Sequence, residues 1–257
     1  MLQQVIVFAL STKNDELLEL LGEYASHHQE AFDALLATNR YYLQQLNQGI
    51  IAFDALEQGA SINAMNKKGQ SALHLATLKA DKESLSKLIA RGINVNIQDK
   101  DGNTALIHAL ETVLYKDKNE VGRDIAQQLI AAQAQVDIKD DDENTPLIIA
   151  VQNQDLAMVN YLLEHGACLE TFDGDMKTAL FWAAEKGDEA IFDALLKQGA
   201  KVNEVSYPEE NTPLMAALIN RHFSMAQKIL SQTEVAIKQK NRHGKTVLHA
   251  AAGTPEA

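Results

Sequence analysis

Two groups of side chains in the sequence are of types that could bind a metal ion or attack a substrate. His27, His28 and Glu30 stand within one helical turn, where two of them could ligate a metal, but a third ligand is not evident. A solvated polar helix face is therefore the favoured interpretation. Cys168 is the single cysteine, and a catalytic thiol needs a basic partner that the sequence does not place near it. Beside a helix-ending Gly-Ala pair, we expect Cys168 to be a small apolar filler.

The motifs that usually carry enzyme chemistry are missing from the sequence. It contains no Gly-rich phosphate loop, no Cys pair with metal-ligand spacing and no nucleophile elbow. We therefore predict a protein that is not an enzyme and that has no metal and no cofactor.

Acidic side chains recur at a fixed distance before a series of Thr residues, and this points to binding rather than catalysis. The four that stand three residues ahead of a Thr are Asp101, Asp142, Asp175 and Glu209. Three more stand five residues ahead, namely Asp99, Asp140 and Asp173. Stacked turns would place these acids in a negative ridge that docks a basic segment of a partner protein. The alternative is ordinary turn chemistry, because Asp and Asn suit turns in any case.

Net charge and cysteine content exclude several classes of partner and location. The 257 residues carry a formal net charge of −12, with 35 Asp and Glu against 23 Lys and Arg. This balance argues against nucleic acid and against an anionic membrane surface, because both need excess cations. One cysteine cannot form an internal disulfide, so we expect a reducing, cytoplasmic location. The apolar run from Val5 to Leu10 is too short for a signal peptide or a membrane span.

A repeated phrase explains what must position the acidic column. A Thr-x-Leu or Ser-x-Leu phrase begins at Ser71, Thr104, Thr145, Thr178, Thr212 and Thr246, so its spacings are 33, 41, 33, 34 and 34 residues. Thr or Ser is a good helix N-cap, and the Pro that follows two of these Thr residues suits a first helical turn. A second helix follows, for example over 157–164, and Gly166 ends it in a left-handed conformation. One such unit cannot bury its own apolar face, whereas a stack of them can.

This pattern resembles the ankyrin repeat, a unit of a turn and two helices, over about residues 38–252. The resemblance implies an all-α solenoid with about six recognisable units over 63–257, after a degenerate helical N-terminal cap over 1–62. In that cap Thr38 lies 33 residues before Ser71, and two short helices fit between Leu2 and Leu21. His74 and His249 match the family's structural histidine. The pattern is imperfect, because Gln133 replaces the helix-ending Gly, Glu143 replaces the turn Gly, and the Gly-Ala phrase is missing after Leu230.

Further candidates for partner contact come from the unit's second connection and from its inner helix. The 41-residue spacing implies eight extra residues, an insertion at about 111–122 with Tyr115 and locally basic residues such as Arg123. An inert insertion and a contact loop are both open. The family resemblance implies that residues after each inner helix line the concave face, and these include Lys79, Asn153, Lys186 and Asn220. For Trp182, the single tryptophan, packing between helices is the favoured interpretation over an interface role.

The function that these features favour is recognition of a protein partner by a rigid monomeric array. One alternative is the targeting module of a larger enzyme, such as a bacterial effector acting in a host cytosol, with its catalytic domain beyond residue 257. Another is an inhibitory or regulatory subunit. The sequence stops directly after one expected helix. Either that helix is a minimal cap or a longer natural protein has been trimmed here, and trimming is the favoured interpretation.

Overall fold

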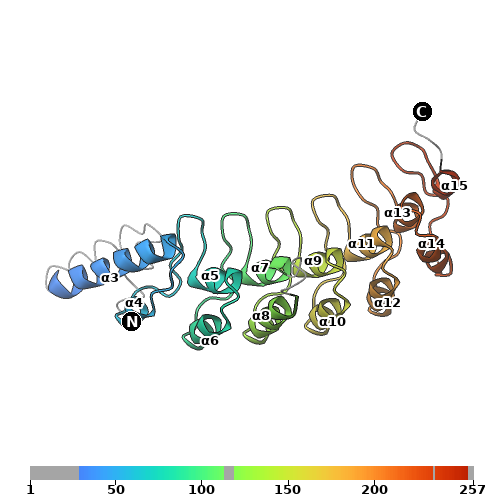
Figure 1. The fold of residues 1–257 in the computed structure, drawn as a ribbon. Coiled ribbons are helices and arrows are strands. Elements are labelled where there is room, and N and C mark those ends of the chain that lie inside the picture. Colours follow the sequence, from blue (N-terminus) through green and yellow to red (C-terminus); the bar gives the residue numbers. More distant parts are fainter. Residues whose placement is uncertain (1–28, 113–118, 234, 254–257) are drawn as a thin grey trace. The chain divides into compact units, whose positions relative to one another are not determined.

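The computed structural model describes residues 29–112, 119–233 and 235–253. The chain forms two compact units, Met1–Lys100 and Asp101–Ala257, which are treated separately below (Figure 1). All regular structure in the described ranges is helical, apart from one isolated bridge between Met65 and Ser71. The predicted all-α fold is therefore confirmed. None of these helices is long and apolar enough to cross a lipid bilayer.

In the first unit, two helix pairs are described. α3 (Gln29–Asn47) packs on α4 (Phe53–Glu57), and α5 (Ala72–Leu78) packs on α6 (Lys82–Ala90). Thr38 lies in the interior of the 19-residue α3 and its hydroxyl donates to the carbonyl of Ala34. It does not cap a helix, so its place in the repeat register, inferred from spacing alone, is wrong. The helices expected between Leu2 and Leu21 lie outside the described residues, as do His27 and His28.

In the second unit, first and second helices alternate along the chain. The first helices are α7 (Ala105–Thr112), α9 (Pro146–Gln152), α11 (Ala179–Lys186), α13 (Pro213–Ile219) and α15 (Val247–Ala252). The second helices are α8 (Asn119–Ala131), α10 (Leu156–Glu164), α12 (Glu189–Lys197) and α14 (Phe223–Leu230). Each of the first helices α7, α9, α11 and α13 contacts the next first helix and its own second helix, and the hairpins extend from the opposite side of the first-helix row (Figure 1). This is the stack of equivalent helix pairs that the spacing predicts.

Capping explains why each first helix begins at its Thr. The side-chain oxygens of Thr145, Thr178 and Thr212 accept hydrogen bonds from the backbone amides three residues on, at 3.4, 3.2 and 3.3 Å. In α5 and α15 a capping box forms instead, where His74 and His249 accept from the N-cap amide through Nδ1. These two histidines therefore have the structural role that the resemblance implies.

The predicted turn positions adopt left-handed backbone even where glycine is missing. Gly166 has φ +85°, and the substitutes Gln133 and Glu143 have φ +67° and +62°. Left-handed backbone crowds a Cβ, so these two residues hold a strained conformation that the packing of the repeat imposes. The repeat geometry thus persists where the repeat sequence does not.

The described part of the insertion lengthens a helix. α8 has 13 residues, whereas α10 and α12 have nine each. Arg123 lies on α8 and its Nε donates to Asp155 at 2.6 Å, so it binds the N-cap residue of α10 and is not part of a contact loop. Tyr115 lies outside the described residues.

Cys168 is exposed, and its interpretation as a buried filler is wrong. The neighbouring Ala167, at 7% exposure, takes the buried place in the exit from α10. The backbone amide of Cys168 donates to Asp137 Oδ1 of the preceding repeat at 2.9 Å. This bond holds the backbone in place while the side chain is exposed.

Candidate functional site

Successive hairpins of the second unit are joined through the backbone at the very position that carries the acidic column. In each step, an amide N–H of one hairpin donates to the carbonyl oxygen of the acid in the hairpin before it. The four bonds are Asp141 to Asp101 (3.1 Å), Gly174 to Asp142 (3.1 Å), Tyr207 to Asp175 (2.7 Å) and Arg242 to Glu209 (3.0 Å). The structure therefore brings the four predicted acids together along one edge of this unit.

The hairpins approach one another so closely that side chains are excluded at some facing positions. A Cβ on Gly102 would lie 2.6 Å from the backbone nitrogen of Asp141 in the next hairpin. One hairpin further on, the residue equivalent to Gly102 is Glu143, and the facing residue is Gly174, whose own Cβ would lie 3.2 Å from the Asp142 carbonyl oxygen. In these two contacts the glycine lies on opposite sides, and in both its missing side chain lets the neighbouring backbone approach closely.

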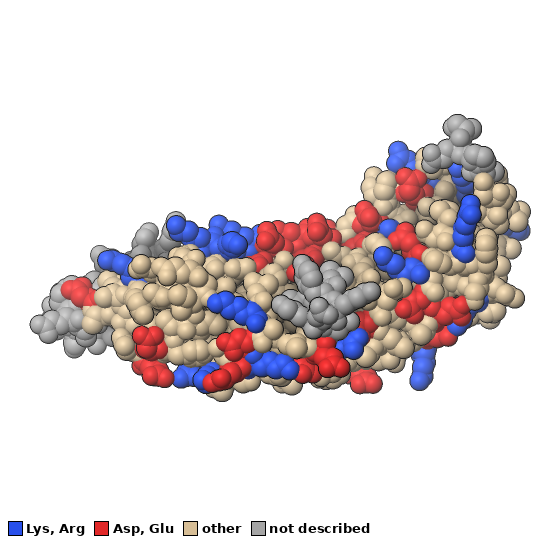
Figure 2. Space-filling view, in the orientation of Figure 1, with Lys and Arg blue, Asp and Glu red and all other residues tan. Residues whose placement is uncertain are grey.

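We define the acidic hairpin edge as Asp101, Asp142, Asp175 and Glu209, and its members differ in how far they are neutralised. The first three are exposed, and Figure 2 shows acidic side chains gathered along the hairpins. Asp142 has no ion-pair partner within the described ranges, whereas Asp175 lies 4.0 Å from Lys177. Glu209 is half-exposed and lies 2.7 Å from Nε2 of His243. Asp175 and Glu209 therefore each have a basic side chain nearby, whereas Asp142 has none within the described ranges.

The acids five residues ahead of each Thr do not extend this edge as predicted. Asp99 is 8% exposed and Asp173 is 5% exposed. Asp173 Oδ1 accepts from the amides of Asp175 and Lys177 at 3.0 and 2.9 Å, so its carboxylate turns inward to close the hairpin. Short polar side chains commonly close turns by bonding backbone amides further along the chain. These acids are structural, and the prediction that they join the ridge is wrong.

Asp140 occupies the same turn position but is only half-buried. Its carboxylate accepts the Asn144 amide at 2.7 Å. Burial raises the pKa of the Asp140 carboxyl, and the nearby negative charge of Asp142 raises it further. This turn position therefore disfavours the ionised form of the Asp140 carboxyl.

The hairpin before α13 contains one extra residue, which shifts the register read from the sequence. The amide of Ser206 donates to the carbonyl of Asn211, just as the amide of Asp173 donates to that of Lys177. Ser206 therefore takes the turn position that the spacing assigned to Tyr207. Tyr207 is displaced to the surface, where it is 63% exposed.

The predicted contact residues at the ends of the first helices lie in two different settings. Asn153, Lys186 and Asn220 follow one another at the C-terminal ends of α9, α11 and α13. Lys186 and Asn220 are exposed, whereas the half-buried Asn153 amide donates to the carbonyl of Leu110 at 2.9 Å and so ties α9 to α7. Lys79 belongs to the first unit, where its Nζ donates to the carbonyl of Gly49 at 2.6 Å.

Trp182 is the centre of a polar cluster that the sequence interpretation missed. The indole is half-buried and its Nε1–H donates to Asp173 Oδ2 at 2.6 Å. Lys177 Nζ lies 4.2 Å from the ring centroid and 3.1 Å from a Glu185 carboxylate oxygen. The cluster links the hairpin to the first helix by a cation–π contact and an ion pair. Its sequence signal was a Lys one residue before Thr178 and a Glu seven residues after it.

Comparison with known proteins decides the family. Residues 5–119 and 117–206 match a family model described as ankyrin repeats (3 copies). The chain belongs to the ankyrin-repeat family. Over 154 residues it is 28% identical to mouse Rabankyrin-5 and 26% identical to human Rabankyrin-5. These alignments cover 59% of this chain and 13% of each relative, so the chain spans a small part of their length.

Ankyrin repeats are generally protein–protein interaction modules, and the surface of this array suits such a role. The acidic hairpin edge and the ends of α11 and α13 present charged and amide groups from a backbone that hydrogen bonds hold in place. A preformed surface of this kind loses little conformational entropy when a partner binds. Its chemistry is that of ion pairs and hydrogen bonds.

Proposed function

We propose that the second unit of this ankyrin array recognises a protein partner through its hairpin tips and first helices. The acidic hairpin edge receives a basic segment of that partner. We also propose a cytoplasmic location and a role without catalysis of its own. The targeting module of a larger enzyme and the inhibitory or regulatory subunit are the alternatives to this proposal.

The observation that carries the proposal is the backbone ladder through Asp101, Asp142, Asp175 and Glu209. Because each backbone carbonyl in the ladder is hydrogen-bonded, the backbone positions from which the carboxylates project are fixed before a partner arrives. Exposed ion pairs contribute only about 0.2–1 kcal/mol each. The edge therefore acts mainly on the rate and the orientation of encounter.

A fluorescein-labelled peptide of alternating Arg and Ser tests this idea, with a peptide of alternating Glu and Ser as its charge-reversed counterpart. The variant Asp101→Asn, Asp142→Asn, Asp175→Asn removes three charges from the edge. We expect it to slow association of the Arg-Ser peptide about tenfold at low salt and to flatten the salt dependence.

The matched control removes the same charge from second helices, through Glu120→Gln, Glu164→Gln and Asp193→Asn. This control variant should keep most of the association rate. Equal losses in both variants would mean that only net charge matters, and the assignment of the hairpin edge would then fail.

A further inference from the structure

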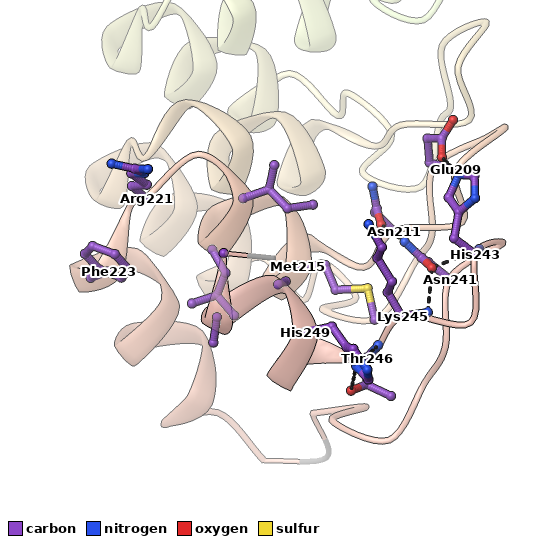
Figure 3. A pocket seen from close by; sticks show the side chains of 15 residues that line it. Glu209, Asn211, Met215, Arg221, Phe223, Asn241, His243, Lys245, Thr246 and His249 are labelled. Carbon is purple, nitrogen blue, oxygen red and sulfur yellow. Dashed lines mark hydrogen bonds and ion pairs between the residues drawn. The ribbon is translucent and has the colours of Figure 1, made fainter. Parts of the chain in front are cut away.

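An open pocket of about 850 Å³ lies at the C-terminal part of the second unit. Of the acidic hairpin edge, only Glu209 is among its lining residues. The pocket is lined by the hairpin before α13, by α13, by the loop before α14 and the first residue of α14, and by the hairpin before α15 and α15 itself (Figure 3). Its apolar wall includes Met215, Ile219 and Phe223, and its polar wall includes Arg221, Lys245 and His249. The pocket therefore offers an apolar contact and several hydrogen-bond donors side by side.

The apolar wall is unusually exposed for large side chains. Ile219 is 54% exposed and Phe223 is 63% exposed. Both lie beside the turn between α13 and α14, at either side of Arg221. Water contact with these side chains is costly, so an apolar group of a partner would gain by covering them.

Lys245 lacks the partners that its equivalent has in another repeat. Lys177 also stands one residue before its Thr, and it binds Glu185, seven residues after that Thr, and lies over Trp182. Counting the same way from Thr246, the place of Glu185 is taken by Gly253 and the place of Trp182 by Ala250. Within the described residues the Lys245 ammonium has no ion-pair partner, so its charge is available to a ligand.

The remaining polar groups of the pocket favour the same kind of ligand. The Arg221 guanidinium is exposed and has no ion-pair partner in the described ranges. His249 accepts the Thr246 amide through Nδ1, which leaves its Nε2 side to donate. Among the described residues that line the pocket, the one side-chain carboxylate is that of Glu209, which lies 2.7 Å from His243. Donors and cations thus outnumber free acceptors.

We propose that this pocket binds an acidic segment of a partner protein that carries an apolar anchor residue. The anchor covers Ile219 and Phe223, while carboxylates of the segment pair with Lys245 and Arg221. This inference rests on the proposed function as a protein-recognition array, and it adds a second subsite with the opposite charge preference. A basic segment would meet two unpaired cations here and would be repelled.

The probe is a panel of fluorescein-labelled peptides, each with two Leu or Phe residues at varied spacing between Glu residues. Two companion panels carry Lys in place of Glu, or Ser in place of the apolar residues. Fluorescence anisotropy with the full chain should detect binding of members of the first panel and weaker binding of the companion panels. Failure of every acidic-apolar peptide up to millimolar concentration would overturn the proposal.

Matched variants locate the site. Arg221→Gln with Lys245→Gln should weaken binding about tenfold, and Phe223→Ser should weaken it about fivefold. The control Lys238→Gln with Lys240→Gln removes the same charge from exposed residues outside the pocket and should change affinity less than about twofold. Circular dichroism and melting curves verify that the variants fold. Equal weakening in the Arg221/Lys245 variant and its control would place the binding elsewhere.

The Arg-Ser peptide separates this inference from the proposed function. Pocket variants that lose the acidic peptides but keep the Arg-Ser peptide support two distinct subsites. If the acidic panel fails while the Arg-Ser peptide still binds the hairpin edge, the pocket proposal falls and the proposed function stands. Failure of both sets of peptides counts against the proposed function itself.

Discussion

Single residues at the turn position of each hairpin show how one structural task is met by different side chains. Asn66 and Asn241 accept two backbone amides each through Oδ1, and Asp173 does the same. An amide oxygen is therefore sufficient for closing the turn. Where Asp is used, its charge is an addition that the turn itself does not need, and the setting decides whether that charge costs stability.

At Asp140 the charge is a cost, and this gives a pH-dependent prediction. Because the folded state raises the pKa of this carboxyl, its ionisation opposes folding, and this cost appears as pH rises from the unfolded pKa through the folded one. Asp140→Asn keeps the oxygen that accepts the Asn144 amide. We expect the variant to be about 0.5 kcal/mol more stable than the parent at pH 7, and to gain nothing at pH 3. Urea unfolding at the two pH values measures the difference, and a gain of equal size at pH 3 would contradict the charge argument.

At the scale of elements, the turns that end the helices carry local strain where glycine is replaced. Gln133 follows α8 with φ +67°, in the place that Gly166 takes after α10. Gln133→Gly should relieve this strain and stabilise the protein by about 0.5–1 kcal/mol. Gln133→Ala is the matched control, because Ala keeps the Cβ and should give no gain. Thermal melting of both variants separates relief of strain from loss of the Gln side chain.

The elements also show how far sequence reasoning reaches. The Thr positions predict the starts of α9, α11 and α13, because N-capping acts locally. Gly166, Gly187 and Gly199 mark the ends of α10, α11 and α12 in left-handed backbone, whereas α14 ends at Ser231 in right-handed backbone. α3 was missed as one long helix, since Thr38 fits the spacing without capping anything. The extra residue before Thr212 lengthens that spacing to 34 residues, from the 33 between Thr145 and Thr178. The spacing alone does not place the extra residue inside the hairpin, so it did not predict that Ser206 rather than Tyr207 takes the turn position.

The candidate site was predicted in part for the same reason. Sequence columns place Asp142 and Asp173 equally well in a turn, but only packing shows that one carboxylate is exposed and the other buried. The unpaired charge of Lys245 could have been predicted from the sequence. The residue before Thr178 is Lys177 and the residue seven after it is Glu185, whereas the same two positions around Thr246 hold Lys245 and Gly253. The exposure of Phe223 could be seen only in the structure, because the sequence does not show whether a Phe at the start of a second helix is buried.

At the scale of the whole molecule, charge changes sign along the second unit. The hairpin before α9 contains Asp140, Asp141, Asp142 and Glu143, whereas the pocket beside α15 is lined by Arg221 and Lys245. Complementary charge fixes the direction in which a partner lies on a surface. A partner with a basic segment followed by an acidic one can therefore bind in one orientation only, and the row of first helices sets the separation of its two ends.

Position in the stack, rather than the motif itself, sets how much each repeat residue contributes to stability. The Leu two residues after the Thr is 1% exposed at Leu106, 0% at Leu147, 1% at Leu180 and 1% at Leu214, but it is 78% exposed at Leu248. The first four are covered by their own second helix and by neighbouring first helices. Leu248 lies on α15, which contacts α13 and has no second helix among the described residues.

The pair Leu214→Ala and Leu248→Ala tests this rule on chemically identical substitutions. Removing the buried Leu214 side chain loses apolar burial and leaves a cavity, so we expect a cost of about 2–5 kcal/mol. Removing Leu248, which is mostly in water already, should cost less than about 0.5 kcal/mol. Urea unfolding followed by far-ultraviolet circular dichroism compares the two with the parent. Similar costs would mean that Leu248 is buried in solution, because only burial makes the loss of these methyl groups expensive.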